Sequence, residues 1–341
     1  MESVSAANNS VFIGNYMAAN TTAGADSTVA IGTNCLSASG YSGEANTVVG
    51  HQAGNNLSSG DNNTLIGRSA GAAVTTGFAN VILGMQAGSA STTGGGNVLI
   101  GYQAGDAITT SSNNVFIGRG SGTSANASGT NGKNTGVGRS ALSDLSSGIN
   151  NTALGYNSAP SLSTGSSNVM VGYQADVSTG AASNQNSFGY SESCSGDNQV
   201  TLGNSSIGTL RCQATSITSV SDERDKTSVE DLPYGLECVD SLKPKRFVWN
   251  NRPETKLKIN DKGEKIEVEI TSANKGKKDI GFIAQELQTV DDDFLNLVYD
   301  SNPEKLEASY SKLIPVLVKA IQELKAELDK KIGRAHVWTP V

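Results

Sequence analysis

The sequence predicts a mainly β protein, in which a repetitive β-roll or β-solenoid-like shaft precedes a small α+β domain that ends in a helix. Short apolar triplets recur about every 17 residues through the first 203 residues. Charged residues are scarce at first and dense later, with 5 Lys or Arg through Val220 and 20 after it. The last segment carries apolar residues at helical spacing. Two kinds of material are therefore joined near residue 220.

The repeat is defined by a glycine that closes each apolar triplet. Successive glycines are 17 or 18 residues apart, with one step of 20, and two looser copies follow the ten clear ones. The closing glycines are Gly14, Gly32, Gly50, Gly67, Gly84, Gly101, Gly118, Gly138, Gly155 and Gly172, then Gly189 and Gly203. Val, Ile and Leu suit a buried strand, and glycine supplies the positive φ of a repeated corner. The alternative, a disordered Gly/Ser/Asn linker, is disfavoured by this regular spacing.

Each unit predicts one strand followed by a small-residue turn, such as HQAG or YQAG. About three apolar residues per unit cannot bury a core alone, so the coils must stack, and we expect chains to share a core. An asparagine opens most units and should form a ladder whose amides bond the next coil. These residues are Asn46, Asn63, Asn80, Asn97, Asn114, Asn134, Asn151 and Asn168.

The NTVVG and TVAIG units resemble the head repeats of trimeric bacterial adhesins and the shaft repeats of phage tail fibres. This resemblance implies a trimer. Adhesin periods are usually shorter than 17, and the sequence leaves open whether each chain forms a separate roll or all three intertwine.

Residues 204–220 are expected to form an extended linker, β-branched from Leu210 to Val220. The motif SDERDK follows from Ser221, then GFIAQEL from Gly281 and YSKLIPVLVKAIQEL from Tyr310. Over residues 221–332 the chain resembles the endosialidase-type intramolecular chaperone domain, an auto-processing serine peptidase family.

That resemblance implies that Ser221 is a nucleophile and Lys226 its general base, cutting the chain beside the serine. A lysine acts as a base only when neutral, and burial would lower its pKa. The attacked carbonyl is that of Val220, through an N-to-O acyl shift, or that of Ser221 itself. Alone, SDERDK would indicate an exposed charged turn. The residues expected to support the site are Asp222, Arg224, Gln285 and Glu286.

Alternating residues at 257–259 and 266–270 predict a β-hairpin. Lys278–Val290 predicts a short helix that buries Ile280, Ile283, Ala284 and Leu287, and the acidic run 291–293 should be solvated because it lacks calcium-loop spacing.

A terminal helix is predicted over 311–332, with Ser311 as its N-cap and Pro315 in its first turn. Its seam fits a helical bundle, of three strands if the family resemblance holds, and a single-chain amphipathic helix is the alternative. The seam residues are Leu313, Leu317, Ile321, Leu324 and Leu328. Residues 333–341 resemble a translated sequencing adapter.

The net charge of −7 disfavours nucleic-acid binding, and no apolar run or leader indicates membrane insertion. Four widely spaced cysteines predict no disulfide framework or metal site, and we expect no cofactor.

The favoured function is a virion structural protein, a fragment of a phage tail fibre or spike that forms a homotrimer and attaches to a host cell-surface receptor, either glycan or protein. It would contact other tail proteins and assemble in the host cytoplasm. Its C-terminal domain would template trimerisation and then release itself in a single turnover. The alternatives are a trimeric cell-surface adhesin fragment and, less favoured because the carboxylates are scattered, a polysaccharide depolymerase.

Overall fold

The computed structural model describes residues 9–17, 25–125, 132–207, 209–211, 221–250, 254–259, 265–270, 275–300 and 306–336. The chain divides into two compact units. One holds residues 1–204 with 256–268, and the other holds 205–255 with 269–341.

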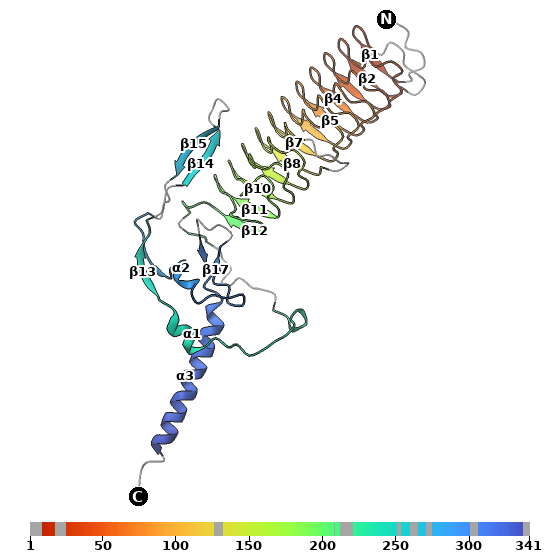
Figure 1. Ribbon diagram of the computed structural model, residues 1–341. Helices are drawn as coiled ribbons and strands as arrows, with labels where there is room; N and C mark the ends of the chain where they lie inside the picture. Colours follow the sequence, from red (N-terminus) through yellow and green to blue (C-terminus); the bar gives the residue numbers. More distant parts are fainter. Residues whose placement is uncertain are drawn as a thin grey trace. The chain divides into compact units, whose positions relative to one another are not determined.

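The repeats form a single-chain β-solenoid with one short strand per coil (Figure 1). Its strands make one 12-stranded parallel sheet in chain order, in which residue i pairs with residue i+17 over most coils. The strands are β1(Val11–Ile13), β2(Val29–Ile31), β3(Thr47–Val49), β4(Thr64–Ile66), β5(Val81–Leu83), β6(Val98–Ile100), β7(Val115–Ile117), β8(Thr135–Val137), β9(Thr152–Leu154), β10(Val169–Val171), β11(Gln185–Phe188) and β12(Gln199–Leu202). The predicted repeat is confirmed, including its two looser copies.

The solenoid core is complete within one chain. The middle residue of most strands points inward and is fully buried, for example Leu65, Ile82 and Leu99. Two further buried columns run beside it, one from the alanines of the turns, such as Ala87, and one of residues such as Leu57. A core shared between chains is therefore not needed to bury these side chains, because the expectation counted only the strand residues and missed these two columns.

The corner glycines hold positive φ, as predicted. Gly84 has a φ of 134°, and a Cβ atom there would lie 2.4 Å from the carbonyl oxygen of Gly101 in the next coil. Both the backbone conformation and the close approach between coils therefore exclude other residues.

The asparagine ladder also forms as predicted, inside the solenoid. The Nδ2 of Asn97 donates to Oδ1 of Asn80 at 3.1 Å and to the carbonyl oxygen of Ser111 at 3.0 Å. Its own Oδ1 accepts the backbone N–H of Asn114 at 3.0 Å. The same pattern links the buried asparagines from Asn46 to Asn168, so each coil satisfies polar groups that stacking buries.

Downstream of the solenoid the elements are short, apart from the last helix. In chain order they are η1(Glu223–Asp225), α1(Leu236–Ser241), β13(Lys245–Val248), β14(Glu254–Ile259), β15(Lys265–Ile270), β16(Lys278–Gly281), α2(Ala284–Leu287), β17(Val298–Tyr299), β18(Glu307–Ala308) and α3(Leu313–His336). Strands β14 and β15 form the predicted two-stranded sheet, and the turn between them lies outside the described residues.

The second unit has its own small core, which includes Leu287, Leu297, Leu313 and Val316. Helix α1 packs against α3, and the Glu323 carboxylate of α3 accepts the backbone N–H of Leu236 at 2.7 Å. This bond satisfies one of the free N–H groups at the start of α1. The packing anchors the first turns of α3 to the unit.

The predicted helix over Lys278–Val290 is wrong in its first part. Residues 278–281 form β16, which pairs antiparallel with β13, and Ile280 is 79% exposed rather than buried. The helix is only α2, with Leu287 buried and Ile283 38% exposed. The apolar spacing matched a helix, but pairing with β13, a segment about 30 residues earlier, decided the strand.

The terminal helix begins at Leu313 and continues to His336, beyond its predicted end at Ile332. Pro315 lies in its first turn, as expected. The described part of the linker, residues 204–207 and 209–211, contains no strand, and residues 212–220 lie outside the described residues. The segment that resembles an adapter supplies backbone of α3 through His336, and residues 337–341 lie outside the description.

The acidic run at 291–293 is not simply solvated. The Asp291 carboxylate accepts the backbone N–H groups of Leu297 and Val298 at 2.7 and 2.9 Å. The neighbouring Asp292 accepts that of Leu295 at 2.8 Å and the hydroxyl of Tyr234. The two carboxylates thus stabilise the turn before β17. This hydrogen bonding to nearby backbone N–H groups was not predicted, because three adjacent acidic residues usually indicate a solvated surface.

Candidate functional site

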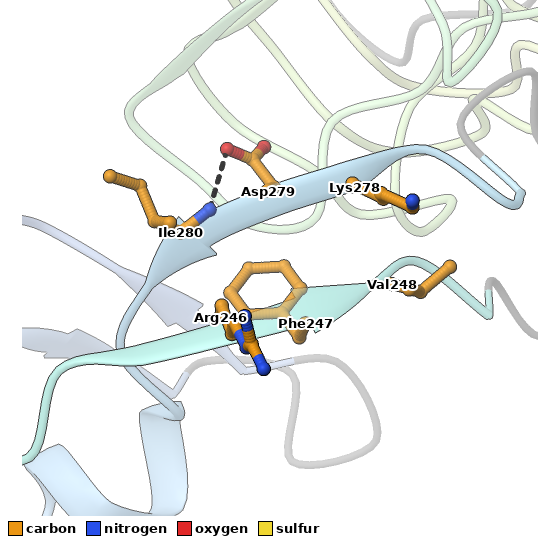
Figure 2. Close-up of a pocket in the computed structure, with 6 residues that line it drawn as sticks. All are labelled: Arg246, Phe247, Val248, Lys278, Asp279 and Ile280. Atoms are coloured by element: carbon orange, nitrogen blue, oxygen red, sulfur yellow. Dashed lines mark hydrogen bonds between the residues drawn. The ribbon is translucent and has the colours of Figure 1, made fainter.

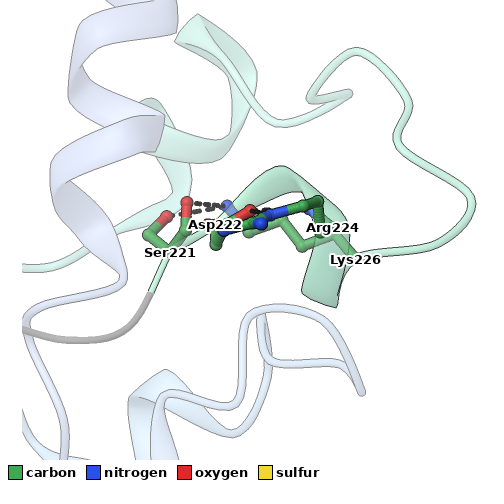
Figure 3. Close-up of polar contacts among 4 residues, drawn as sticks. All are labelled: Ser221, Asp222, Arg224 and Lys226. Carbon is green, nitrogen blue, oxygen red and sulfur yellow. Dashed lines mark hydrogen bonds and ion pairs between the residues drawn. The ribbon is translucent and has the colours of Figure 1, made fainter.

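The loop that begins at Ser221 is held by an ion pair between two of its own residues. The guanidinium of Arg224 donates two hydrogen bonds to the Asp222 carboxylate, from Nε to Oδ1 at 3.0 Å and from Nη2 to Oδ2 at 2.7 Å (Figure 3). Asp222 also accepts the backbone N–H of Arg224 and caps the 3₁₀ turn η1. The Arg224 side chain holds the pKa of the Asp222 carboxyl below its ordinary value. These charge-assisted hydrogen bonds therefore stabilise the turn between Ser221 and Lys226.

The turn brings the Ser221 and Lys226 side chains into contact. Nζ of Lys226 donates to Oγ of Ser221 at 2.7 Å and to the carbonyl oxygen of the same residue at 3.0 Å (Figure 3). A neutral amine in this place can accept the hydroxyl proton and still donate to the carbonyl oxygen. The two groups are thus within the reach that a nucleophile and its base require.

Both side chains are exposed in the isolated chain. The expectation that burial surrounds Lys226 is therefore not met within this chain. Desolvation disfavours an ammonium group only where water is excluded, so any such exclusion must come from a surface outside the described contacts.

The two other expected supporting residues lie on α2. Gln285 is exposed, and Oε1 of Glu286 is 3.6 Å from Nζ of Lys245. The remaining carboxylate oxygen of Glu286 is buried without a hydrogen-bond partner among the described residues. Within the described part of the chain, no hydrogen bond or ion pair joins either residue to Ser221 or Lys226.

The predicted helix seam is divided by the structure. Leu313 is 5% exposed and belongs to the core of its own unit, so its place in an intermolecular seam is wrong. The other four residues are exposed, Leu317, Leu324 and Leu328 by about half and Ile321 by 65%. Ile314, 63% exposed, extends the seam by one heptad position; it was missed, although its spacing of seven from Ile321 signals it.

An open groove lies over the β13–β16 pair (Figure 2). Its lining mixes apolar side chains with charges of both signs: Arg246, Phe247, Val248, Lys278, Asp279 and Ile280. None of these is a nucleophile placed beside a base, so the groove offers no catalytic arrangement comparable to the Ser221 turn.

Within the described ranges, no helix is both long and apolar enough to cross a membrane, and no group of His, Cys, Asp or Glu is clustered to hold a metal ion. The three described cysteines are unpaired. Burial raises the pKa of the Cys35 thiol to about 12, which makes it a packing residue rather than a nucleophile.

Residues 221–298 match the model of the protein family described as chaperone of endosialidase. The match begins at Ser221 and contains Lys226, α2 and the acidic turn. Searches of curated proteins and of solved structures gave no significant match. Members of this family carry a self-cleaving chaperone domain. This similarity and the β-solenoid shaft together fit a tail-fibre-like protein.

Proposed function

We propose that this chain is part of a phage tail fibre or spike that attaches the virion to its host, and that its C-terminal domain assembles a trimer and then releases itself. The observation that carries the proposal is the contact between Nζ of Lys226 and Oγ of Ser221, in a segment that matches a self-processing family. The mature protein would be the solenoid, in the virion tail, after assembly in the host cytoplasm.

The proposed reaction is one intramolecular acyl transfer. Oγ of Ser221 attacks a carbonyl carbon beside it while Lys226 takes the hydroxyl proton, and that proton then passes to the departing amide nitrogen. Water hydrolyses the resulting ester and frees the serine. The attacked carbonyl is either that of Val220 or that of Ser221. Folding places the reacting groups together, which replaces the entropy cost of a bimolecular encounter.

Trimer formation is supported by two apolar surfaces. One is the exposed seam of α3. The other is the outward face of the solenoid sheet, whose first and third strand positions remain accessible, with Ile13 58% and Leu154 48% exposed. Parallel sheets are almost always covered on both faces, and large apolar patches mark interfaces. Further copies of this chain would cover both surfaces. We propose that the same assembly excludes water from Lys226.

A denaturing gel tests the self-cleavage. We expect the wild-type chain of 35.1 kDa to separate into fragments on either side of Ser221, while Ser221→Ala and Lys226→Gln stay at full length. Removing either member of a nucleophile–base pair lowers the rate by about a thousandfold or more. Thr227→Ala removes the hydroxyl next to Lys226 and serves as the matched control, which should be cleaved normally. Soluble wild-type trimer that remains full length would sink the proposal.

A further inference from the structure

One register position of the solenoid, the residue directly after each corner glycine, carries an unusual set of side chains. They are Asn15, Thr33, His51, Arg68, Met85, Tyr102, Arg119, Arg139, Tyr156, Tyr173, Tyr190 and Asn204. All are exposed or half-buried. The solenoid, residues 1–203, contains four Lys or Arg, of which three lie in this column, and none of its nine Asp or Glu does. Basic and aromatic groups are thus concentrated on one line along the shaft.

Six consecutive coils carry tyrosine or arginine in this column, and these residues form the Tyr–Arg stripe: Tyr102, Arg119, Arg139, Tyr156, Tyr173 and Tyr190. Tyr156, Tyr173 and Tyr190 stack with ring centroids 5.2 Å apart and planes at 8°. The guanidinium of Arg139 lies 5.6 Å from the Tyr156 ring centroid, and that of Arg119 lies 5.7 Å from the Tyr102 centroid. These contacts hold the side chains in register, so the stripe is preorganised for a ligand.

We infer that the Tyr–Arg stripe binds an acidic polysaccharide laid along the shaft. Guanidinium groups match carboxylate, sulfate or phosphate groups with two parallel hydrogen bonds, and neither Arg119 nor Arg139 forms an ion pair within the described residues. Tyrosines present both apolar ring edges and hydroxyl groups, which suit the mixed surface of a sugar. With one side chain per coil at about 4.8 Å, the stripe spans roughly 24 Å, so the ligand is a chain rather than a single sugar.

Single-stranded nucleic acid fits less well. Its bases need open aromatic faces, whereas Tyr173 has a tyrosine ring stacked on each side. Nucleic acids also carry a phosphate at every unit, and the solenoid has more acidic than basic residues. A glycan whose charges are separated by neutral rings meets less of this repulsion. The inference deepens the proposed attachment role and depends on it only for the source of the glycan.

Binding of the full chain, carrying Ser221→Ala for uniformity, to three immobilised polymers tests the site. Hyaluronan carries one carboxylate for every two sugars, chondroitin sulfate carries a sulfate group as well, and dextran is neutral. We expect binding to at least one acidic polymer and a loss of about tenfold in affinity for the double variant Arg119→Gln/Arg139→Gln. Arg119→Lys/Arg139→Lys, which keeps the charge without the fork, should fall in between. Lys133→Gln removes an exposed positive charge outside the stripe and should change affinity less than twofold.

The inference is wrong if no acidic polymer binds, if the arginine variants bind as tightly as Lys133→Gln, or if an oligothymidine binds more tightly than the glycans. A change in oligomeric mass instead of affinity would make the stripe a subunit contact and would also overturn it. Adsorption of the labelled chain to bacterial cells separates the two proposals. Adsorption that the double variant retains in full would overturn the glycan site and leave the attachment role standing.

Discussion

Asn97 and Gly84 show how single residues make the solenoid possible. The glycine recurs in every coil and the asparagine in most of them, because stacking buries polar groups and brings backbones together. The amide of Asn97 bonds the coils on either side, and the missing Cβ of Gly84 lets two backbones meet. Because these requirements repeat with the coil, the residues repeat in the sequence. Both roles could therefore be predicted from spacing alone.

Replacing Asn97 with alanine should weaken the middle of the solenoid. The change removes the partner of the buried Asn114 N–H and of the Ser111 carbonyl, at a cost of about 1–3 kcal/mol for each buried group left unsatisfied. Thermal unfolding followed by circular dichroism, with hydrogen exchange to locate the loss, measures it. Asn56→Ala, at an exposed asparagine of another coil, is the control. Equal melting of the two variants would contradict the ladder's role.

Substituting alanine for Gly84 should also destabilise the shaft, by about 3 kcal/mol or more, because φ is positive and the new Cβ meets the next coil. Gly40→Ala is a matched comparison, since its φ of 76° is also strained but nothing lies within 4 Å of the added Cβ. Denaturant unfolding of both variants separates backbone strain from the contact between coils. A similar loss in both would mean that the contact contributes little.

At the scale of elements, α3 serves two structures at once. Its first turns pack inward through Leu313, Val316 and Ala320, whereas the line from Ile314 to Leu328 is exposed. Ile314 and Ile321 fall at heptad position a, and Leu317 and Leu324 at d. In an isolated coiled coil, Ile at a and Leu at d favour two helices. The proposed trimer therefore requires contacts elsewhere in the chain to set the number of subunits at three.

Leu324→Asp tests whether the α3 seam joins chains. A charge in the seam should prevent trimer formation, because association would desolvate it without a partner, and we expect self-cleavage to stop with it. Ala326→Asp places the same charge on the opposite face of the helix and should leave both intact. Sedimentation gives the mass and a denaturing gel gives the cleavage. A trimer that survives Leu324→Asp would remove α3 from the assembly mechanism.

At the scale of the whole molecule, the two units differ in how they use charge. The solenoid is held by uncharged ladders and apolar columns. Among the described residues, the carboxyl groups whose pKa is lowered are Asp222, Asp279 and Asp292, all in the second unit, where hydrogen bonds favour the ionised form. In the solenoid, burial instead raises the pKa of Asp106.

Acid should therefore affect the second unit selectively. A carboxyl with a lowered folded-state pKa stabilises the fold above its unfolded pKa of about 3.9, and this contribution is lost as pH falls through the folded value. Protonation of Asp106 should instead stabilise the solenoid, because it removes the cost of burying a charged carboxylate. Calorimetry of the Ser221→Ala chain between neutral pH and about pH 3 measures the unfolding temperature of each unit. This temperature should fall with pH for the second unit and stay constant for the solenoid. A solenoid transition that falls equally would contradict this assignment.

Features that repeat along the chain, or whose residues lie close together in the sequence, could be predicted from the amino-acid sequence. The strands, corner glycines and asparagine ladder could be predicted because successive coils need the same residue types at the same positions. The motif from Ser221 to Lys226 could be predicted because its residues are adjacent in the sequence. Three features are visible only in the folded chain: Leu313 faces inward, residues 278–281 form a strand beside β13, and Lys226 is exposed in the single chain. Each of these depends on partners distant in sequence, whose pairing and burial no local spacing records.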